Sequence, residues 1–395
     1  MKEDTKIVEA GRNPKAFKGA VNPPVYHVST VLVDSVEDWQ RRRDKDERTM
    51  IYGRAGTPTS YAFEDAVAEL EGAAGCMSFP SGLAAIAGAL LAFSKSGEHM
   101  LVTDSIYTPT RRLCDEVLTD FGVEVTYYDP MIGGAIGELM RDNTTVVFTE
   151  SPGSLTFEVQ DLPAITAAAH EKGAKVLIDN TWASPLFFKP FDHGADVSIH
   201  AATKYLVGHS DAMLGAVTAT AECFDRLRDV SRWLGQCAGP DDLYLGQRGI
   251  RTLGVRLREH QRRGIDLANW LKARPEVIRV MHPALPDDPG HELWKRDFTG
   301  ASGLFGFVME SCTPEQLSAY MNGLEHFGMG ASWGGYESLL IPTDPEESRT
   351  ATEWNPGGQS MRVHAGLEDL DDLTADLERA FERLHAAARA CAAES

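Results

Sequence analysis

The chain has 395 residues, too many for one hydrophobic core, and its 43% hydrophobic and 24% charged residues are ordinary for a soluble globular enzyme. Lys and Arg total 38 against 58 Asp and Glu, and the net charge of -20 disfavours nucleic acid or an anionic membrane as a partner. No uninterrupted apolar stretch is long enough to cross a bilayer, and the first residues lack a signal-peptide core. The 6 cysteines are scattered without a Cys-x-x-Cys pair, so we expect free thiols in a reducing, cytoplasmic compartment.

The first part of the chain shows little regular periodicity. It contains Pro23-Pro24 and a mixed-charge run at residues 41–48 that is typical of a solvated surface segment. Such a segment often reaches across to another subunit. We therefore predict an N-terminal arm over residues 1–56 that contacts a neighbouring subunit.

Regular periodicity begins after the arm, where apolar residues recur at helical spacing from residue 60 and stop at Gly72. Short apolar runs then alternate with helical stretches. The apolar runs lie at residues 75–79, 100–103, 123–128, 145–149, 176–178 and 197–199. This alternation predicts a mostly parallel sheet with crossover helices, in a domain over residues 57–250.

The pattern changes again near Arg251. An amphipathic helix is predicted over residues 257–271, followed by strands at 277–280, 303–309 and 360–365. A final helix carries its apolar side chains on one face between residues 370 and 384. We therefore predict a smaller α/β domain over residues 251–395.

Two chemically active side chains follow neighbouring apolar strands. Asp179 follows the run 176–178, and Lys204 comes shortly after the run 197–199. Ligands of parallel sheets gather beyond the carboxyl ends of the strands, so we expect the two side chains to share a site. A lysine that forms a Schiff base and a carboxylate that keeps a pyridine nitrogen protonated are what pyridoxal phosphate chemistry requires. Taken singly, a surface lysine and a helix-capping aspartate would be the ordinary interpretation.

Two further segments are suited to a phosphate group. After the first predicted strand, Ser81 can cap a helix, and Gly82 permits a close backbone approach to an anion at the helix start. Tyr52 and Arg54 offer a phenol and a bidentate guanidinium. Each segment alone would be an ordinary helix cap or turn, and it is Lys204 that gives them weight.

In this order, these elements resemble the transsulfuration enzymes of the cysteine and methionine metabolism family, which are fold-type I pyridoxal phosphate proteins. The resemblance runs nearly from end to end. Its motifs are Tyr-x-Arg at 52–54, Ser-Gly-Leu-Ala-Ala at 81–85, Tyr107 after Thr103-Asp104, Asp-Asn-Thr-Trp at 179–182, Thr-Lys-Tyr at 203–205, Gly-His-Ser-Asp at 208–211, Ser-Trp-Gly-Gly-Tyr-Glu-Ser-Leu at 332–339 and Arg-Val-His-Ala-Gly-Leu-Glu-Asp at 362–369.

The resemblance implies a fold-type I α/β architecture with pyridoxal 5'-phosphate as the cofactor. Lys204 would hold the cofactor, Asp179 would pair with its pyridine nitrogen, and Tyr107 would stack on its ring. The implied phosphate ligands are the amides of Gly82 and Leu83 and the side chain of Thr203, with Tyr52 and Arg54 supplied by the neighbouring subunit.

The substrate side of the site is also implied by the resemblance. Arg362 would bind the α-carboxylate of an amino-acid substrate with help from Ser332, and Trp333 and Tyr52 would line the same pocket. The family usually assembles as a homotetramer made of two active dimers.

Within the family, the segment 201–213 and the segments 233–236, 251–258 and 282–286 resemble the bacterial cystathionine beta-lyases. That branch implies β-elimination of L-cystathionine to homocysteine, pyruvate and ammonia in methionine biosynthesis, with side activity on other cysteine S-conjugates. Two positions depart from the patterns. Ala201 replaces a serine of many family members, and Ala331 stands where the beta-lyases are expected to have a tyrosine.

Trp333 bears on the choice between β- and γ-elimination, because γ-type members usually have leucine at its position. An indole there narrows and stiffens the pocket, which favours one bound geometry and hence β-elimination. A simple packing role for Trp333 is the other interpretation. A cystathionine gamma-lyase, a gamma-synthase or a methionine gamma-lyase-type enzyme remains the alternative.

Lys204 would also transfer protons in this reaction, from the substrate α-carbon to the leaving thiolate. A lysine at its usual pKa is a poor base, so burial and the cationic cofactor are expected to lower the pKa of Lys204.

Two other classes of protein compete with this interpretation. Residues 208–212 imitate the nucleophile elbow of a serine hydrolase, with Ser210 as nucleophile, but alanine replaces the last glycine of that motif. A non-catalytic binding protein on the same fold is disfavoured by the complete catalytic set. The 12 histidines show no ligand-spaced cluster, so no metal site is expected.

Overall fold

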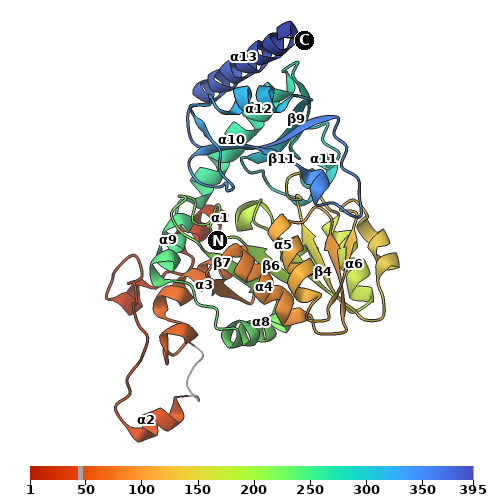
Figure 1. The fold of residues 1–395 in the computed structure, drawn as a ribbon. Coiled ribbons are helices and arrows are strands. Elements are labelled where there is room, and N and C mark those ends of the chain that lie inside the picture. Colours follow the sequence, from red (N-terminus) through yellow and green to blue (C-terminus); the bar gives the residue numbers. More distant parts are fainter. Residues whose placement is uncertain (43–47, 395) are drawn as a thin grey trace.

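A computed structural model describes residues 1–42 and 48–394, and its fold contains two β-sheets formed by successive parts of the chain (Figure 1). The seven-stranded sheet has the order β1-β7-β6-β5-β4-β2-β3, in which β7 is antiparallel to both neighbours and the other pairs are parallel. Its strands are β1 (Gly75–Phe79), β2 (His99–Thr103), β3 (Glu124–Tyr128), β4 (Thr144–Glu150), β5 (Lys175–Asp179), β6 (Val197–His200) and β7 (Gly215–Ala219). The mostly parallel sheet is therefore confirmed. The strand β7 was missed, because its glycine and alanines give it little apolar bulk.

Helices cover both faces of this sheet. Neighbouring residues of β4 show this directly, since Phe148 belongs to one apolar cluster and Val147 to another. The helices on the Phe148 face include α4 (Gly82–Phe93) and α8 (Ala221–Trp233). The Val147 face is covered by α3 (Pro58–Glu71), α6 (Leu162–Glu171) and α9 (Pro240–Ile250). Burial on both faces explains why the predicted strands are continuous apolar runs.

The second sheet has five strands in the order β10-β11-β12-β9-β8. Its strands are β8 (Val277–Met281), β9 (Leu304–Glu310), β10 (Phe327–Gly328), β11 (Ser338–Thr343) and β12 (Gly358–His364). The helices of this part are α10 (Leu253–Lys272), α11 (His291–Asp297), α12 (Pro314–Met321) and α13 (Leu370–Glu394). The predicted α/β character is confirmed, although β10 and β11 were not predicted and both long helices extend further than the apolar pattern indicated.

The N-terminal part was predicted to be irregular, but it begins with a helix, α1 (Glu3–Glu9). Ile7 is buried in that helix, and Arg251 Nη1 donates a hydrogen bond to its carbonyl oxygen at 3.0 Å. Further along, the segment that carries α2 (Val36–Arg41) extends away from the rest of the chain (Figure 1). Residues 43–47 of the mixed-charge run lie outside the described residues.

The remaining elements are short. They are α5 (Thr108–Arg112), α7 (Ser184–Phe187) and helical turns at Pro14–Phe17, Gly53–Ala55, Leu113–Leu118, Gly133–Leu139, Pro190–His193 and Pro345–Glu347. In the described part of the chain, no helix combines the length and the apolar composition that a membrane span requires.

Candidate active site

Asp179 and Lys204 lie at the same edge of the seven-stranded sheet. Asp179 is the last residue of β5 and is in register with Ile199 of β6, and Lys204 lies in the turn that follows β6. Asp179 is 7% exposed, and its Oδ1 accepts hydrogen bonds from the backbone N–H and the hydroxyl of Thr181. Burial raises the pKa of Asp179, while the Thr181 bonds and the nearby Lys204 charge act in the opposite direction.

The amine of Lys204 is held between the two sheets. Its Nζ donates a hydrogen bond to Ser332 Oγ at 2.6 Å and lies 5.5 Å from the centroid of the Trp333 ring. Burial and the positive charge of Arg362 lower the pKa of Lys204 to about 8, against the opposing effect of Asp179. An amine with this pKa can act as a nucleophile or a base near neutral pH.

Arg362 comes from the second sheet, where it lies on β12 in register with Ile341 of β11. Its Nη2 donates a hydrogen bond to the carbonyl oxygen of Ser332 at 3.3 Å. Burial lowers the pKa of Arg362 to about 10, so the group stays positively charged at neutral pH. Among residues 1–42 and 48–394 it forms no ion pair with a carboxylate, which leaves its guanidinium available for the carboxylate of a ligand.

Tyr107 lies at the start of α5 with 43% of its surface exposed. Its backbone N–H donates a hydrogen bond to Glu150 Oε2 at 2.8 Å. Glu150 is the last residue of β4 and is in register with Asp179, and burial together with the Asp179 charge raises the pKa of Glu150 well above its ordinary value. The sequence prediction missed Glu150, although a polar residue directly after the apolar run 145–149 is the same signal that identified Asp179.

The helix start predicted to bind phosphate has a well-defined cap. Ser81 Oγ accepts a hydrogen bond from the amide of Ala84 at 3.1 Å, and α4 begins at Gly82. A Cβ at Gly82 would lie 2.5 Å from the Cβ of Ala201, so this approach requires glycine. The first amides of α4, those of Gly82 and Leu83, lack intrahelical partners and form an anion-binding terminus.

Thr203 has its hydroxyl within the turn that carries Lys204. Its Oγ1 donates to the carbonyl oxygen of Leu214 at 3.1 Å and accepts from the amide of Leu214 at 2.8 Å. The hydroxyl therefore fixes the lysine turn in this structure, and binding a phosphate would replace its bond to the carbonyl.

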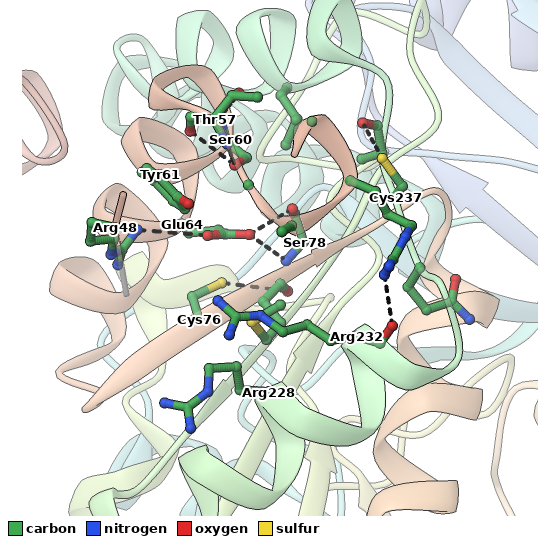
Figure 2. A pocket seen from close by; sticks show the side chains of 18 of the residues that line it. Arg48, Thr57, Ser60, Tyr61, Glu64, Cys76, Ser78, Arg228, Arg232 and Cys237 are labelled. Atoms are coloured by element: carbon green, nitrogen blue, oxygen red, sulfur yellow. Dashed lines mark hydrogen bonds and ion pairs between the residues drawn. The ribbon is translucent and has the colours of Figure 1, made fainter. Parts of the chain in front are cut away.

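Tyr52 and Arg54 are not brought to this edge by their own chain. Arg54 Nη1 donates to the carbonyl oxygen of Arg232 at 2.9 Å, and the hydroxyl of Tyr52 accepts from Ser29 Oγ at 3.4 Å. Arg54 is among the residues that line a cavity of about 480 Å³ beside the edge strand β1. Figure 2 shows Arg232 and the α3 residues Ser60 and Glu64 in the lining of this cavity. Neither Lys204 nor Asp179 nor Arg362 lines that cavity.

Comparison with known proteins agrees with this geometry. Residues 4–382 match the family model described as Cys/Met metabolism PLP-dependent enzyme. The chain belongs to this family of pyridoxal phosphate enzymes. It is 47% identical to cystathionine beta-lyase MetC of Escherichia coli over 97% of this chain and 99% of that protein. It is 46% identical to cystathionine beta-lyase of Salmonella typhimurium over 96% of this chain and 98% of that protein.

Structures of family members have the same fold. A cystathionine gamma-lyase from Lactobacillus plantarum, complexed with L-serine, superposes with a TM-score of 0.88. It is 29% identical in sequence, and the match covers 98% of this chain and 100% of that one. The fold-type I architecture that the sequence motifs implied is therefore confirmed.

The residues at the sheet edge fit the family's cofactor. Both hydrogen bonds that Asp179 accepts within the described chain end on Oδ1, so Oδ2 is available for a pyridine N–H. Lys204 offers an amine of lowered pKa for the aldehyde, and the glycine-dependent helix start at Gly82 offers amides for the phosphate. The exposed ring of Tyr107 offers a flat face for the pyridine ring.

The surroundings of Ser210 do not form a hydrolase site. Its Oγ donates to the carboxylate of Glu337 at 2.5 and 2.7 Å, and Nδ1 of the adjacent His209 bonds to the carbonyl oxygen of Val207 at 2.7 Å. The element that follows Ser210 is the strand β7, whereas a nucleophile elbow leads into a helix. Among the described side chains, no group of three or more His, Cys, Asp or Glu could hold a metal ion.

Proposed function

We propose that the protein is a carbon–sulfur lyase that cleaves L-cystathionine by β-elimination, which with water gives homocysteine, pyruvate and ammonia, a step of methionine biosynthesis. The relatives that cover nearly the whole chain at 46% and 47% identity bear the name cystathionine beta-lyase. The observation that carries the proposal is the amine of Lys204, which has a pKa of about 8 and lies 2.6 Å from Ser332, with Arg362 bonded to the same serine.

The pyridoxal phosphate that Lys204 binds supplies the electron sink for the pair left at the substrate α-carbon. Arg362 binds the α-carboxylate in a bidentate manner, which places the α-carbon close to Lys204. Lys204 takes the α-proton and delivers a proton to the sulfur that leaves from the β-carbon. Asp179 would stabilise a proton on the cofactor's pyridine nitrogen, and Glu150 accepts the hydrogen bond of the Tyr107 amide, which fixes the residue whose ring would stack on the cofactor.

The wall formed by Trp333 favours β- over γ-elimination. Its ring packs against Tyr205 with centroids 5.4 Å apart and stands beside Nζ of Lys204, so it restricts the space around the base. Removing a second proton, from the β-carbon, requires a mobility that this wall limits. Cysteine S-conjugates with a thiolate leaving group are proposed as further substrates. The second candidate is γ-elimination, because the fold is shared with a cystathionine gamma-lyase.

We further propose a cytoplasmic homotetramer of two active dimers, in which Tyr52 and Arg54 of one chain complete the phosphate site of its neighbour. Supporting this, both residues have their hydrogen bonds away from Lys204 in their own chain. The division into an arm (1–56), a cofactor-binding domain (57–250) and a C-terminal domain (251–395) is part of the same proposal.

The test is turnover of L-cystathionine by the purified protein, with both keto-acid products quantified. Pyruvate in stoichiometric amount with homocysteine is the expected result. Formation of 2-oxobutyrate as the main keto acid would support the γ-elimination candidate instead, and absence of both keto acids would contradict a lyase function.

A further inference from the structure

Residues 332–337 form a turn that lies against the lysine segment. Ser332 accepts a hydrogen bond from Lys204 on its hydroxyl and one from Arg362 on its carbonyl oxygen. Gly334 has a φ of +85°, and a Cβ there would lie 3.0 Å from the Cα and Cβ of Lys204. The turn therefore contacts both the base and the proposed carboxylate-binding arginine.

The imidazole of His364 fixes the middle of this turn. His364 ends β12, two residues after Arg362, and is 1% exposed. Its Nε2 accepts a hydrogen bond from the amide of Gly334 at 3.2 Å, and its Nδ1 donates to the carbonyl oxygen of Glu337 at 3.1 Å. Both ring nitrogens are thus used on backbone groups, and these bonds require the neutral tautomer with the proton on Nδ1.

The surroundings keep this imidazole neutral. Burial lowers the pKa of His364 well below its ordinary value; any charge on His260, Arg362 or Lys204 acts in the same direction, and the bond to Glu337 opposes it. The ring of Tyr205 lies 6.0 Å from the ring of His364 and 5.4 Å from that of Trp333. Because Tyr205 follows Lys204 in the chain, one aromatic cluster connects the base, the imidazole and the indole.

We propose that His364 is a positioning residue for the lyase reaction, which through its Nε2 bond to the Gly334 amide holds Ser332 and Trp333 against Lys204. This inference rests on the proposed function, because the turn it positions is the proposed substrate side of the site. His364 itself does not touch the reacting atoms. Its loss would move the groups that orient the substrate while leaving the cofactor ligands Asp179 and Gly82 in place.

Two substitutions of His364 distinguish the contribution of its Nε2 hydrogen bond from that of its Nδ1 hydrogen bond. In His364→Gln, the side-chain carbonyl can reach the position of Nε2 and accept from Gly334. In His364→Asn, the shorter side chain can replace only the Nδ1 donor to Glu337. If the Gly334 bond is the one that matters, the glutamine variant retains more function than the asparagine variant.

His282→Leu is the matched control. His282 is fully buried, accepts a hydrogen bond from the amide of Ala284 at 3.1 Å on a ring nitrogen, and packs against Trp182 and Phe305. Leucine offers no acceptor to the Ala284 amide, so this variant creates a comparable defect, a partly buried amide without a side-chain acceptor. Residue 282 lies outside the turn 332–337.

The experiment compares these three variants with the wild type as full-length proteins carrying their cofactor. Hydrogen–deuterium exchange followed by mass spectrometry reports the amides of residues 332–337 without substrate, and steady-state kinetics with L-cystathionine reports kcat and KM. For His364→Asn we expect about tenfold faster exchange in this peptide and an increase in KM of about tenfold, with the visible cofactor band retained. His364→Gln should lie near the wild type in both measurements, and His282→Leu should leave exchange in this peptide unchanged.

Equal behaviour of His364→Gln and His364→Asn, or unchanged exchange in both, would overturn the inference. So would the same acceleration in His282→Leu, because the effect would then be a general loss of stability. If the wild type forms no keto acid from L-cystathionine, the proposed function fails, whereas the exchange measurement still decides whether His364 holds the turn.

Discussion

The lysine edge of the sheet and the N-terminal arm differ in how much of their surface one chain can bury. At the edge, Asp179 and Lys204 are enclosed by two sheets and have partners within the same chain. In the arm, large apolar side chains face outward, with Leu32 87%, Val36 66% and Trp39 54% exposed. An apolar segment of this kind is typical of a surface that another protein covers. The difference is consistent with the proposal that the lysine site forms within one chain and that the neighbouring chain completes the phosphate site.

The largest effect is expected when the lysine edge loses its amine. Lys204→Ala removes the covalent attachment and the base together, so turnover of L-cystathionine should fall by about 10⁴-fold or more. Absorbance spectra of the purified variant should also lack the visible band that the wild type loses on borohydride treatment. Near-normal turnover by this variant would show that the edge is not the reaction site.

A smaller loss is expected when the charge at the edge is removed but its shape is kept. Asp179→Asn can still accept hydrogen bonds from Thr181, but it cannot hold a proton on the pyridine nitrogen by its charge. We expect kcat to fall by about 10²-fold with the cofactor still bound, because electrostatic stabilisation of this kind has that magnitude. Steady-state kinetics and cofactor titration measure the two quantities, and unchanged kcat would remove the role assigned to Asp179.

The arm is tested by complementation between chains. Arg54→Ala should weaken cofactor binding by about tenfold to a hundredfold, the equivalent of one charge-assisted hydrogen bond to phosphate. If Arg54 acts in the neighbouring chain, mixing unfolded Arg54→Ala and Lys204→Ala chains and refolding them gives hybrid dimers with one intact site. At limiting cofactor, about a quarter of the wild-type activity should return, since half of randomly paired dimers are hybrids with one complete site. No recovery would mean that Arg54 acts within its own chain or not at all.

The same contrast explains what the sequence could predict. Asp179 and Lys204 were found because each follows a buried apolar strand, and the carboxyl ends of neighbouring parallel strands meet at one edge. Glu150 follows the same rule, since it comes directly after the apolar run 145–149, but the sequence prediction did not include it. These signals are local, and a few consecutive residues contain them.

The other half of the site depends on contacts between distant parts of the chain. Ser332 and Arg362 approach Lys204 only after β12 pairs with β9 and β11, and periodicity contains no trace of that pairing. Family motifs named Ser332 and Arg362, but not the bond from His364 to Gly334 that holds the turn. The strand β7 was not predicted, because Gly215, Ala216 and Ala219 have little of the apolar bulk that marks a buried strand.

The smallest expected effect is on stability, because burying the charged amine of Lys204 lowers the free energy of unfolding of the cofactor-free protein. Burial lowers the pKa of Lys204 to about 8, so between about pH 8 and 10.5 the cofactor-free folded protein binds fewer protons than the unfolded chain. The free energy of unfolding of this form should therefore increase as the pH rises through that window. Below pH 8 the buried charge of Lys204 destabilises the fold. Lys204→Met removes the charge and should stabilise the cofactor-free protein at pH 7 by on the order of 1–2 kcal/mol, with the difference disappearing towards pH 10.5.

Denaturant titrations at several pH values measure this difference. The control is Lys15→Met, which replaces an exposed lysine of the arm and should show no such trend. A difference that stays constant from pH 7 to 10.5 would mean that packing, and not the charge at the lysine edge, sets the stability of this site.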